Sequence, residues 1–282
     1  MTGSGQARRP RDKGTEILLT GAAGRVGRLL RPRLAARGWA VRSFDLEPAP
    51  PGEETDWVRG DITDPEALDA AMTDICAVVH LAGIAREADF PDTLHHNIDG
   101  TYHVFEAARR AGVPRVLFAS TSHVIGFHEQ TSATQAGPRP DTLYGVSKVF
   151  GEALGSLYAD RHGMQVACIR IGSCFPEPTN VLSLATWLSP DDAGRLFNAL
   201  LRAPDLRYET LYGISANTRA WWDLAPARRL GYQPQDNAED FVDAVVAAHG
   251  PLEPAHPDAR YVGGRFTLWP TPGDLQATAP PR

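Results

Sequence analysis

The chain has 282 residues, 43% of them hydrophobic, which suffices for one large α/β domain or for a domain with a smaller lobe. Its net charge of −6 argues against a general affinity for nucleic acid or an anionic membrane surface. No run approaches the roughly 18 apolar residues of a membrane-spanning helix, and the three cysteines form no CxxC pair. We expect a cytoplasmic protein without a nucleic-acid or membrane partner and without a bound metal.

Both ends of the chain differ in composition from the rest. Residues 1–14 hold four basic side chains against one acidic one, and they contain no aromatic residue. We interpret them as a disordered basic leader, because they lack the apolar run of a secretion signal. Residues 251–282 are rich in proline and show little helical periodicity. They predict an extended tail that packs loosely or not at all.

The segment 16–38 predicts a strand, a glycine turn and a helix. The apolar run Glu16–Thr20 leads into Gly21-Ala-Ala-Gly24-Arg-Val-Gly27, and leucines then recur at helical spacing. This order is typical of the opening of a dinucleotide-binding βαβ unit. Gly21 would form the tight turn, Gly24 would let a pyrophosphate approach the helix terminus, and Gly27 would let the helix lie close to the strand.

The following strands add two carboxylates. A strand over residues 40–44 ends in Asp45, where an acidic residue is expected on the adenosine ribose hydroxyls. A carboxylate there repels the 2′-phosphate of NADP, so NAD is the predicted cofactor. Asp61 follows the third predicted strand, 56–59, and is placed to accept a hydrogen bond from the adenine amino group.

Strands and helices continue to alternate up to residue 172. Further strands are predicted at 77–81, 115–119 and 166–171, and helices at 64–72, 92–110 and 143–162. His80 falls within an apolar strand and is interpreted as a core histidine. The alternation predicts a doubly wound parallel sheet, the Rossmann fold, over residues 15–172. A helix from Ser189, a strand over 208–212 and a helix over 238–248 then predict a small substrate-binding lobe within residues 173–250.

The pattern most suggestive of catalysis is Tyr144-Gly-Val-Ser-Lys148, at the start of the predicted helix 143–162. Tyr144 and Lys148 stand one helical turn apart on the same face. An ammonium group beside a phenol favours the phenolate and lowers the pKa of the tyrosine, which makes Tyr144 a candidate base. Thr121 and its neighbouring hydroxyl residues end a central strand, where open α/β sheets bind ligands.

Together, the glycine turn, Asp45, Thr121 and the Tyr144/Lys148 pair resemble the extended short-chain dehydrogenases/reductases, also called the NAD-dependent epimerase/dehydratase superfamily. The resemblance covers residues 16 to about 248. Longer stretches, Phe118–Gly126, Leu143–Glu152 and Arg170–Pro178, look like bacterial uronate dehydrogenases. Such enzymes oxidise the anomeric carbon of glucuronate or galacturonate to an aldarolactone while they reduce NAD.

The resemblance implies roles for individual residues. Tyr144 would accept the proton of the substrate hydroxyl, Lys148 would activate Tyr144, and Thr121 would hydrogen-bond the reacting oxygen. The sugar would face Thr121, Ser122, His123 and Ser173. The implied cofactor-binding residues are Gly21, Gly24, Arg25, Val26, Gly27, Asp45, Leu46, Asp61, Ile62, Leu81, Ala82, Gly83, Lys148 and Ile171.

Two positions depart from the uronate dehydrogenase pattern. Leu182 stands where these enzymes have an arginine that meets the sugar carboxylate, and Ala85 stands where they have a serine. Leucine cannot replace a bidentate arginine–carboxylate contact. The substrate is then either a uronate held by another cation, with Arg86 and Arg219 as candidates, or a neutral aldose.

Two further functions stay open at this point. The chain could be a nucleotide-sugar epimerase or dehydratase that retains its NAD, although Ser122 and His123 stand where dehydratases have an acid/base carboxylate. It could also be a non-catalytic NAD sensor, although such a protein would not need the base. The resemblance also allows for a homo-oligomer, but no exposed stripe in the sequence identifies an interface.

Overall fold

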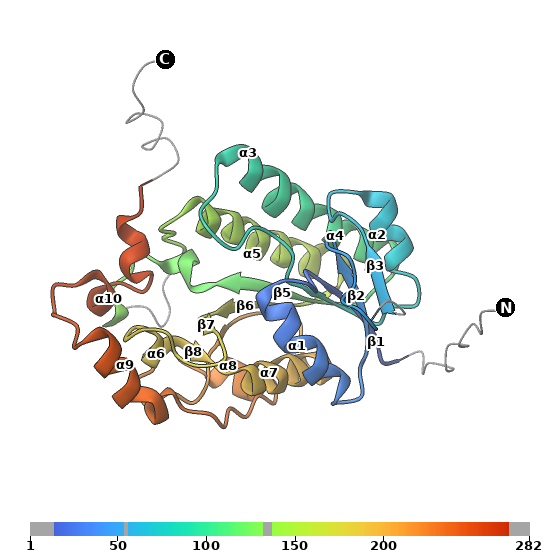
Figure 1. Cartoon of the computed structure of the whole chain (residues 1–282). Helices are drawn as coiled ribbons and strands as arrows, with labels where there is room; N and C mark the ends of the chain where they lie inside the picture. Colours follow the sequence, from blue (N-terminus) through green and yellow to red (C-terminus); the bar gives the residue numbers. More distant parts are fainter. Residues whose placement is uncertain (1–13, 54–55, 132–136, 271–282) are drawn as a thin grey trace, which may run out of the picture.

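The structure is a computed structural model that describes residues 14–53, 56–131 and 137–270. Almost all of the predicted basic leader, and residues 271–282 of the predicted tail, lie outside the described residues. Figure 1 shows a central sheet with helices on both of its faces.

Seven parallel strands form the main sheet within the described residues, in the order β3-β2-β1-β4-β5-β6-β9. They are β1 (Glu16–Thr20), β2 (Ala40–Asp45), β3 (Trp57–Arg59), β4 (Ala77–His80), β5 (Arg115–Thr121), β6 (Gln165–Ile171) and β9 (Tyr208–Gly213). This arrangement confirms the doubly wound parallel sheet. The strand order reverses between β1 and β4, and a crevice for ligands opens there at the carboxyl ends of the strands.

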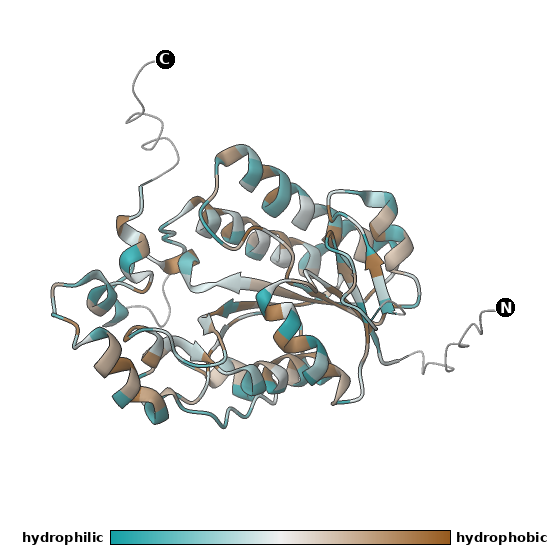
Figure 2. Ribbon diagram, in the orientation of Figure 1, coloured by the Kyte–Doolittle hydropathy of each residue, from teal (hydrophilic) through white to brown (hydrophobic). Residues whose placement is uncertain are grey.

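Each face of the sheet carries its own hydrophobic core, because successive side chains of a strand point to opposite faces. Ile17 and Leu19 of β1 pack toward α1 (Arg25–Ala35), α7 (Pro190–Arg202) and α8 (Ala225–Arg229). Leu18 packs toward α2 (Pro65–Ala71), α4 (Gly100–Arg110) and α5 (Leu143–His162). Figure 2 shows the strands as the most hydrophobic layer, between helices of mixed hydropathy.

The predicted helix 92–110 is not regular. It starts as α3 (Phe90–Asp92), widens into the π-helical turn η2 (Thr93–Asp99) and continues as α4. Turns of this kind often occur at functional sites. Here the wide turn holds Asn97, a buried residue next to the candidate site.

The region predicted as a small lobe follows β6. It contains β7 (Ser173–Cys174), α6 (Ser183–Thr186), β8 (Trp187–Leu188), the 3₁₀ turn η5 (Ala238–Phe241) and α9 (Val242–His249). A separate hydrophobic cluster that includes Leu184, Trp187 and Val245 forms its core. The strand 208–212, which the sequence placed in this lobe, instead belongs to the main sheet as β9, where it pairs with β6.

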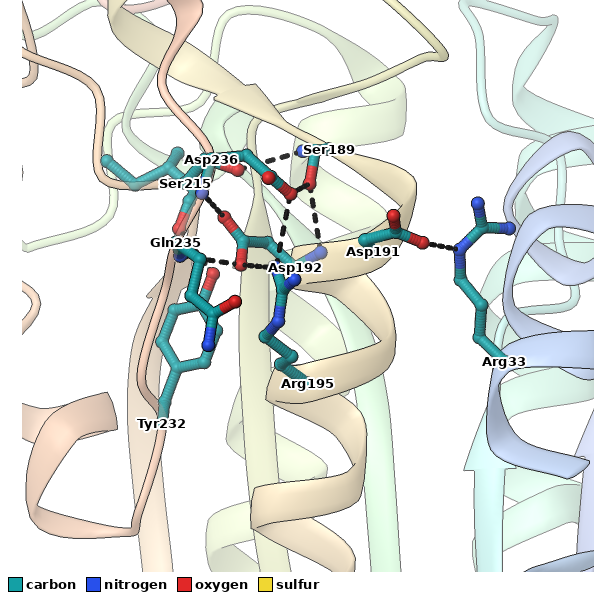
Figure 3. A network of polar contacts seen from close by, with 10 residues as sticks. Arg33, Ser189, Asp191, Asp192, Arg195, Ser215, Tyr232, Gln235 and Asp236 are labelled. Carbon is teal, nitrogen blue, oxygen red and sulfur yellow. Dashed lines mark hydrogen bonds and ion pairs between the residues drawn. The ribbon is translucent and has the colours of Figure 1, made fainter. Parts of the chain in front are cut away.

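Polar contacts at the start of α7 join this lobe to the sheet (Figure 3). Ser189 caps the helix as predicted and accepts a hydrogen bond from the backbone N–H of Asp192 at 2.9 Å. The carboxylate of Asp192 is fully buried and accepts from the backbone N–H groups of Gln235 and Asp236, at 2.9 and 3.0 Å. The segment that leads into η5 is therefore fixed to a helix of the main domain.

The expectation of a loosely packed tail is wrong for residues 256–269. This segment forms α10 (Pro257–Arg260) and the 3₁₀ turn η6 (Gly264–Leu268), and Val262 between them is buried in the main core. The backbone N–H of Gly263 donates to the carbonyl of Gly126 at 3.0 Å. The high proline content did not prevent packing, because Pro257 starts a short helix and aromatic side chains of this segment supply contacts.

Candidate active site

A cavity of about 430 Å³ lies at the carboxyl ends of β1, β2 and β4, where the strand order reverses. All of the predicted cofactor-binding residues line it except Lys148 and Ile171. Ala85 and His96 line it as well. The cavity is therefore built from one continuous region of sequence, residues 21–96, in which each strand end contributes a short loop.

The glycine turn fits a bound dinucleotide. Gly21 has a φ of +72°, and a Cβ on it would lie 2.6 Å from the backbone nitrogen of Ala82. A Cβ on Gly27 would overlap the carbonyl oxygens of Gly21 and Ala22. Side chains are therefore excluded at both positions, and the first turn of α1 lies directly against the loop. The N-terminal N–H groups of α1 can face a pyrophosphate there.

Asp45 supports this cavity as well as lining it. Its carboxylate accepts hydrogen bonds from the backbone N–H groups of Ala23, at 2.8 Å, and Glu47, at 3.0 Å. It thereby fixes the glycine turn to the loop that follows β2, while a carboxylate has further lone pairs for ribose hydroxyls. Asp61 lies in the same cavity and accepts from the N–H of Thr63 at 2.9 Å. These donors and acceptors are suitable for NAD.

The predicted catalytic residues come from two neighbouring elements. Tyr144 lies half-buried in the first turn of α5, and the ammonium of Lys148 lies 5.7 Å from the centre of its ring. Thr121 ends β5, and its side chain hydrogen-bonds Tyr144. Lys148 itself is buried, with its ammonium 4.8 Å from the ring of Phe118. The three side chains thus lie together, beside the part of the cavity where the nicotinamide ring of a bound NAD is expected.

The expected lowering of the tyrosine pKa is not observed. Burial raises the pKa of Tyr144 to about 12, and it outweighs the opposing effects of the Thr121 hydrogen bond and the charge of Arg25. Burial also lowers the pKa of Lys148 to about 8, because the low-dielectric surroundings disfavour the ammonium. The sequence argument considered the charge of Lys148 but not the cost of burying both groups.

Two residues that the sequence reasoning did not select hold this helix in place. The carboxylate of Glu87 accepts from the backbone N–H groups of Leu143 and Tyr144, at 3.2 and 3.4 Å. Asn97, in the π turn, contacts both N–H and C=O of Ile84 and donates to Ser147 at 3.0 Å. A polar residue on the buried side of a predicted helix was the signal available for Asn97. Glu87 had none, since it lies in a loop.

The predicted sugar-facing residues come from the end of β5, from the 3₁₀ turn η3 (Ser122–Ile125) and from β7. Ser122 and His123 follow Thr121 in η3, and the ring of His123 lies 6.1 Å from that of Tyr144. Ser173 contacts Thr186 at 3.0 Å within the small lobe. Phe266 of the tail packs on His123, with 4.5 Å between ring centres. That last contact joins residues far apart in the sequence, and no local pattern indicates it.

The positions that depart from the uronate dehydrogenase pattern are also clear. Leu182 lies against the tail, with a methyl group 2.7 Å from where a Cβ of Gly264 would be. Of the two cations considered as replacements, Arg219 forms a salt bridge with Glu239 at 2.9 Å, whereas Arg86 is exposed and forms no ion pair with any described residue. Arg219 is therefore already committed to another carboxylate.

Other parts of the predicted chemistry can be checked in the described ranges. His80 is fully buried between Thr20 and Thr101, at 2.8 and 3.2 Å, which confirms it as a core histidine. Burial lowers its pKa to about 3. The three cysteines are free thiols. Across residues 14–53, 56–131 and 137–270 there is no metal-binding cluster of three or more His, Cys, Asp or Glu, and no helix long and apolar enough to cross a membrane.

Comparison with known proteins places this site in a family. The chain matches the NAD dependent epimerase/dehydratase family over residues 17–218. It is 44% identical to a uronate dehydrogenase of Agrobacterium fabrum, over 89% of this chain and 96% of that protein. It is 40% identical to an NAD-dependent glucose-6-phosphate dehydrogenase of Haloferax volcanii, over 80% of this chain and 95% of that one.

Solved structures give the same result. The structure of a glucuronic acid dehydrogenase from Chromohalobacter salexigens superposes with a TM-score of 0.87 at 40% identity, covering 92% of this chain and 99% of that one. The glycine turn, the cavity, Tyr144 and Lys148 all lie within residues 17–218, the region that matches the family. The chain therefore belongs to the NAD-dependent epimerase/dehydratase family, as its sequence motifs predicted.

Proposed function

We propose that this protein oxidises the anomeric carbon of a hexuronic acid, glucuronate or galacturonate, to the corresponding aldarolactone with NAD as the oxidant. One observation carries the proposal. Tyr144, Lys148 and Thr121 cluster beside a cavity with a glycine turn and three carboxylates, in a chain that is 44% identical to a uronate dehydrogenase. NAD, when bound, accepts the hydride that leaves C1 and brings a positive charge to the site.

The residues of the chain have distinct roles in this proposal. Tyr144 takes the proton of the C1 hydroxyl, and Thr121 hydrogen-bonds the same oxygen. Because burial raises the pKa of Tyr144 to about 12, the phenol needs nearby positive charge to release its proton. Lys148 is the cation of α5 on the same helical face, and Asn97 and Glu87 keep that helix against the loop beyond β4.

The proposal is tested by following NADH formation with glucuronate, galacturonate, mannuronate, glucose and galactose. We expect many turnovers with glucuronate or galacturonate, and a product with the mass of the aldarolactone. An enzyme that isomerises a nucleotide sugar while it retains its NAD would accumulate no NADH. Absence of turnover with all five sugars would refute the proposal.

A neutral aldose is the second candidate substrate. It is favoured by Leu182, whose methyl group packs on the tail instead of offering a charge to a sugar carboxylate. The same set of sugars separates the two candidates, because a neutral aldose dehydrogenase would have its highest kcat/KM with glucose or galactose. The cytoplasmic location and the homo-oligomer expected from the sequence stay predictions, as does the division into domains at residues 172 and 250.

A further inference from the structure

Asp141 is a buried carboxylate that the proposed reaction does not use. It precedes α5, and its side chain is fully shielded from solvent. Both of its oxygens lie within hydrogen-bond distance of Nδ1 of His123, at 2.9 and 3.0 Å. The hydroxyl of Thr142 donates to it at 3.2 Å. The carboxylate thus contacts a ring that belongs to the candidate sugar site.

Distant parts of the chain enclose this carboxylate. A Cβ on Gly126 or on Gly263 would overlap it, so both glycines lie directly against its oxygens. The backbone N–H of Gly263 also donates to the carbonyl of Gly126 at 3.0 Å. The tail therefore closes over Asp141 and excludes water. Burying a carboxylate in this way is costly unless it receives hydrogen bonds, and the nitrogen of His123 is one of its principal donors.

This contact determines which nitrogen of His123 carries the proton. A carboxylate only accepts hydrogen bonds, so Nδ1 must carry a hydrogen and donate it. In the neutral ring Nε2 is then the acceptor. Nε2 has no hydrogen-bond partner among the residues that the structure describes. The centre of the His123 ring lies 4.5 Å from that of Phe266 and 6.1 Å from that of Tyr144, so both aromatic rings pack near it.

We propose that Asp141 is a positioning residue that fixes His123 as the Nδ1–H tautomer, so that Nε2 accepts a hydrogen bond from a ring hydroxyl of the sugar. The partner is a hydroxyl because an ionised carboxylate has no hydrogen to donate to this nitrogen. In this tautomer His123 therefore recognises a hydroxyl of the sugar ring. This inference rests on the proposed function, in that the substrate is a sugar.

The test uses Asp141→Asn in the full chain, with the accepted sugar and its analogues that lack one ring hydroxyl. An amide can offer its NH₂ group to Nδ1, which stabilises the other tautomer and leaves Nε2 without its acceptor role. In the parent enzyme, loss of the hydroxyl read by His123 should lower kcat/KM by about 10- to 100-fold. In the Asp141→Asn variant that penalty should shrink, because the hydroxyl can then only accept from Nε2–H and its own hydrogen loses its acceptor, while the KM for NAD stays unchanged.

Asp258→Asn is the matched control. Asp258 is a buried carboxylate of the tail itself, and it binds Arg265 at 2.8 Å instead of a site residue. Its loss should lower stability but leave the penalty for the missing hydroxyl intact. His123→Ala and Asp141→Asn should also fail to add in a double-mutant cycle, because both remove the same contact. Additive effects, or an unchanged penalty in Asp141→Asn, would overturn the inference.

Failure of the proposed function can be separated from failure of this inference. Nitrogen NMR of the His123 ring, assigned by comparison with His123→Ala, reports its tautomer without any substrate. A parent enzyme that oxidises no sugar but shows the Nδ1–H tautomer, lost in Asp141→Asn, would refute only the oxidation of sugars. An Nε2–H tautomer in the parent would refute the role of Asp141.

Discussion

The site has two halves that are built in different ways. The cofactor half, Gly21 to Ala85 around the cavity, is continuous in sequence and presents backbone groups and the carboxylates of Asp45, Glu47 and Asp61. The proposed sugar half, formed by the end of β5, the start of α5 and residues 256–269, joins segments far apart in the chain through side chains. Backbone recognition depends on a local turn and tolerates few residue types, whereas a surface of side chains can change its ligand when a single side chain changes.

The comparison predicts that damage to one half leaves ligand binding in the other intact, and the largest such effect is expected at the base. Tyr144→Phe removes the proton acceptor and should lower kcat by about 10³-fold, without changing the affinity for NAD. Rates can be followed by NADH formation, and NAD affinity by calorimetric titration. If more than a tenth of the activity remained, Tyr144 could not be the base.

Lys148, which lies between the halves, should affect stability as well as rate. Burial lowers its pKa from 10.5 to about 8, so between these values the folded protein binds fewer protons than the unfolded chain. Its contribution to the free energy of unfolding therefore rises with pH across this window, by roughly 3 kcal/mol. Relative to Lys148→Met, the parent should gain this stability between pH 7 and 10.5 in urea unfolding. Parallel pH profiles would contradict a buried, pKa-shifted lysine.

In the cofactor half, Asp45→Asn should weaken NAD binding by about tenfold, since the amide is a poorer acceptor for backbone N–H groups and ribose hydroxyls. Discrimination against NADP should fall at the same time, because the repulsion of the 2′-phosphate is lost. The KM values for NAD, NADP and the sugar measure both effects. Glu47→Gln removes a charge from the same rim and serves as the control. A raised KM for the sugar would show that the two halves are not independent.

The smallest effect is expected in the sugar half, where Phe266→Leu removes an aromatic contact to His123. We expect kcat/KM for the sugar to fall about fivefold, with NAD binding unchanged. Trp269→Leu is a suitable comparison, because Trp269 contacts Phe266 but no ring contact joins it to His123 in the described residues. Equal losses in both variants would mean that the tail acts through its general packing.

The sequence was most informative where function depends on local backbone geometry. Gly21, Gly27 and Asp45 could be assigned because their spacing relative to a strand and a helix has few alternatives. The interval from Tyr144 to Lys148 was equally clear, since it is one turn of a helix that runs from Leu143 to His162 as predicted. The tail was misjudged because its contacts are made by scattered side chains, for which prolines and weak periodicity are poor indicators.

By itself, then, the sequence determined the doubly wound sheet, the cavity at the glycine turn and the face of α5 that carries Tyr144 and Lys148. These features follow from hydrophobic periodicity and short motifs, whose effects act over a few residues. The tertiary structure alone decided that burial raises the pKa of Tyr144, that Asp141 binds His123, and that the tail covers the sugar half. Burial and long-range hydrogen bonds depend on which distant segments meet, and no local pattern in the chain encodes that.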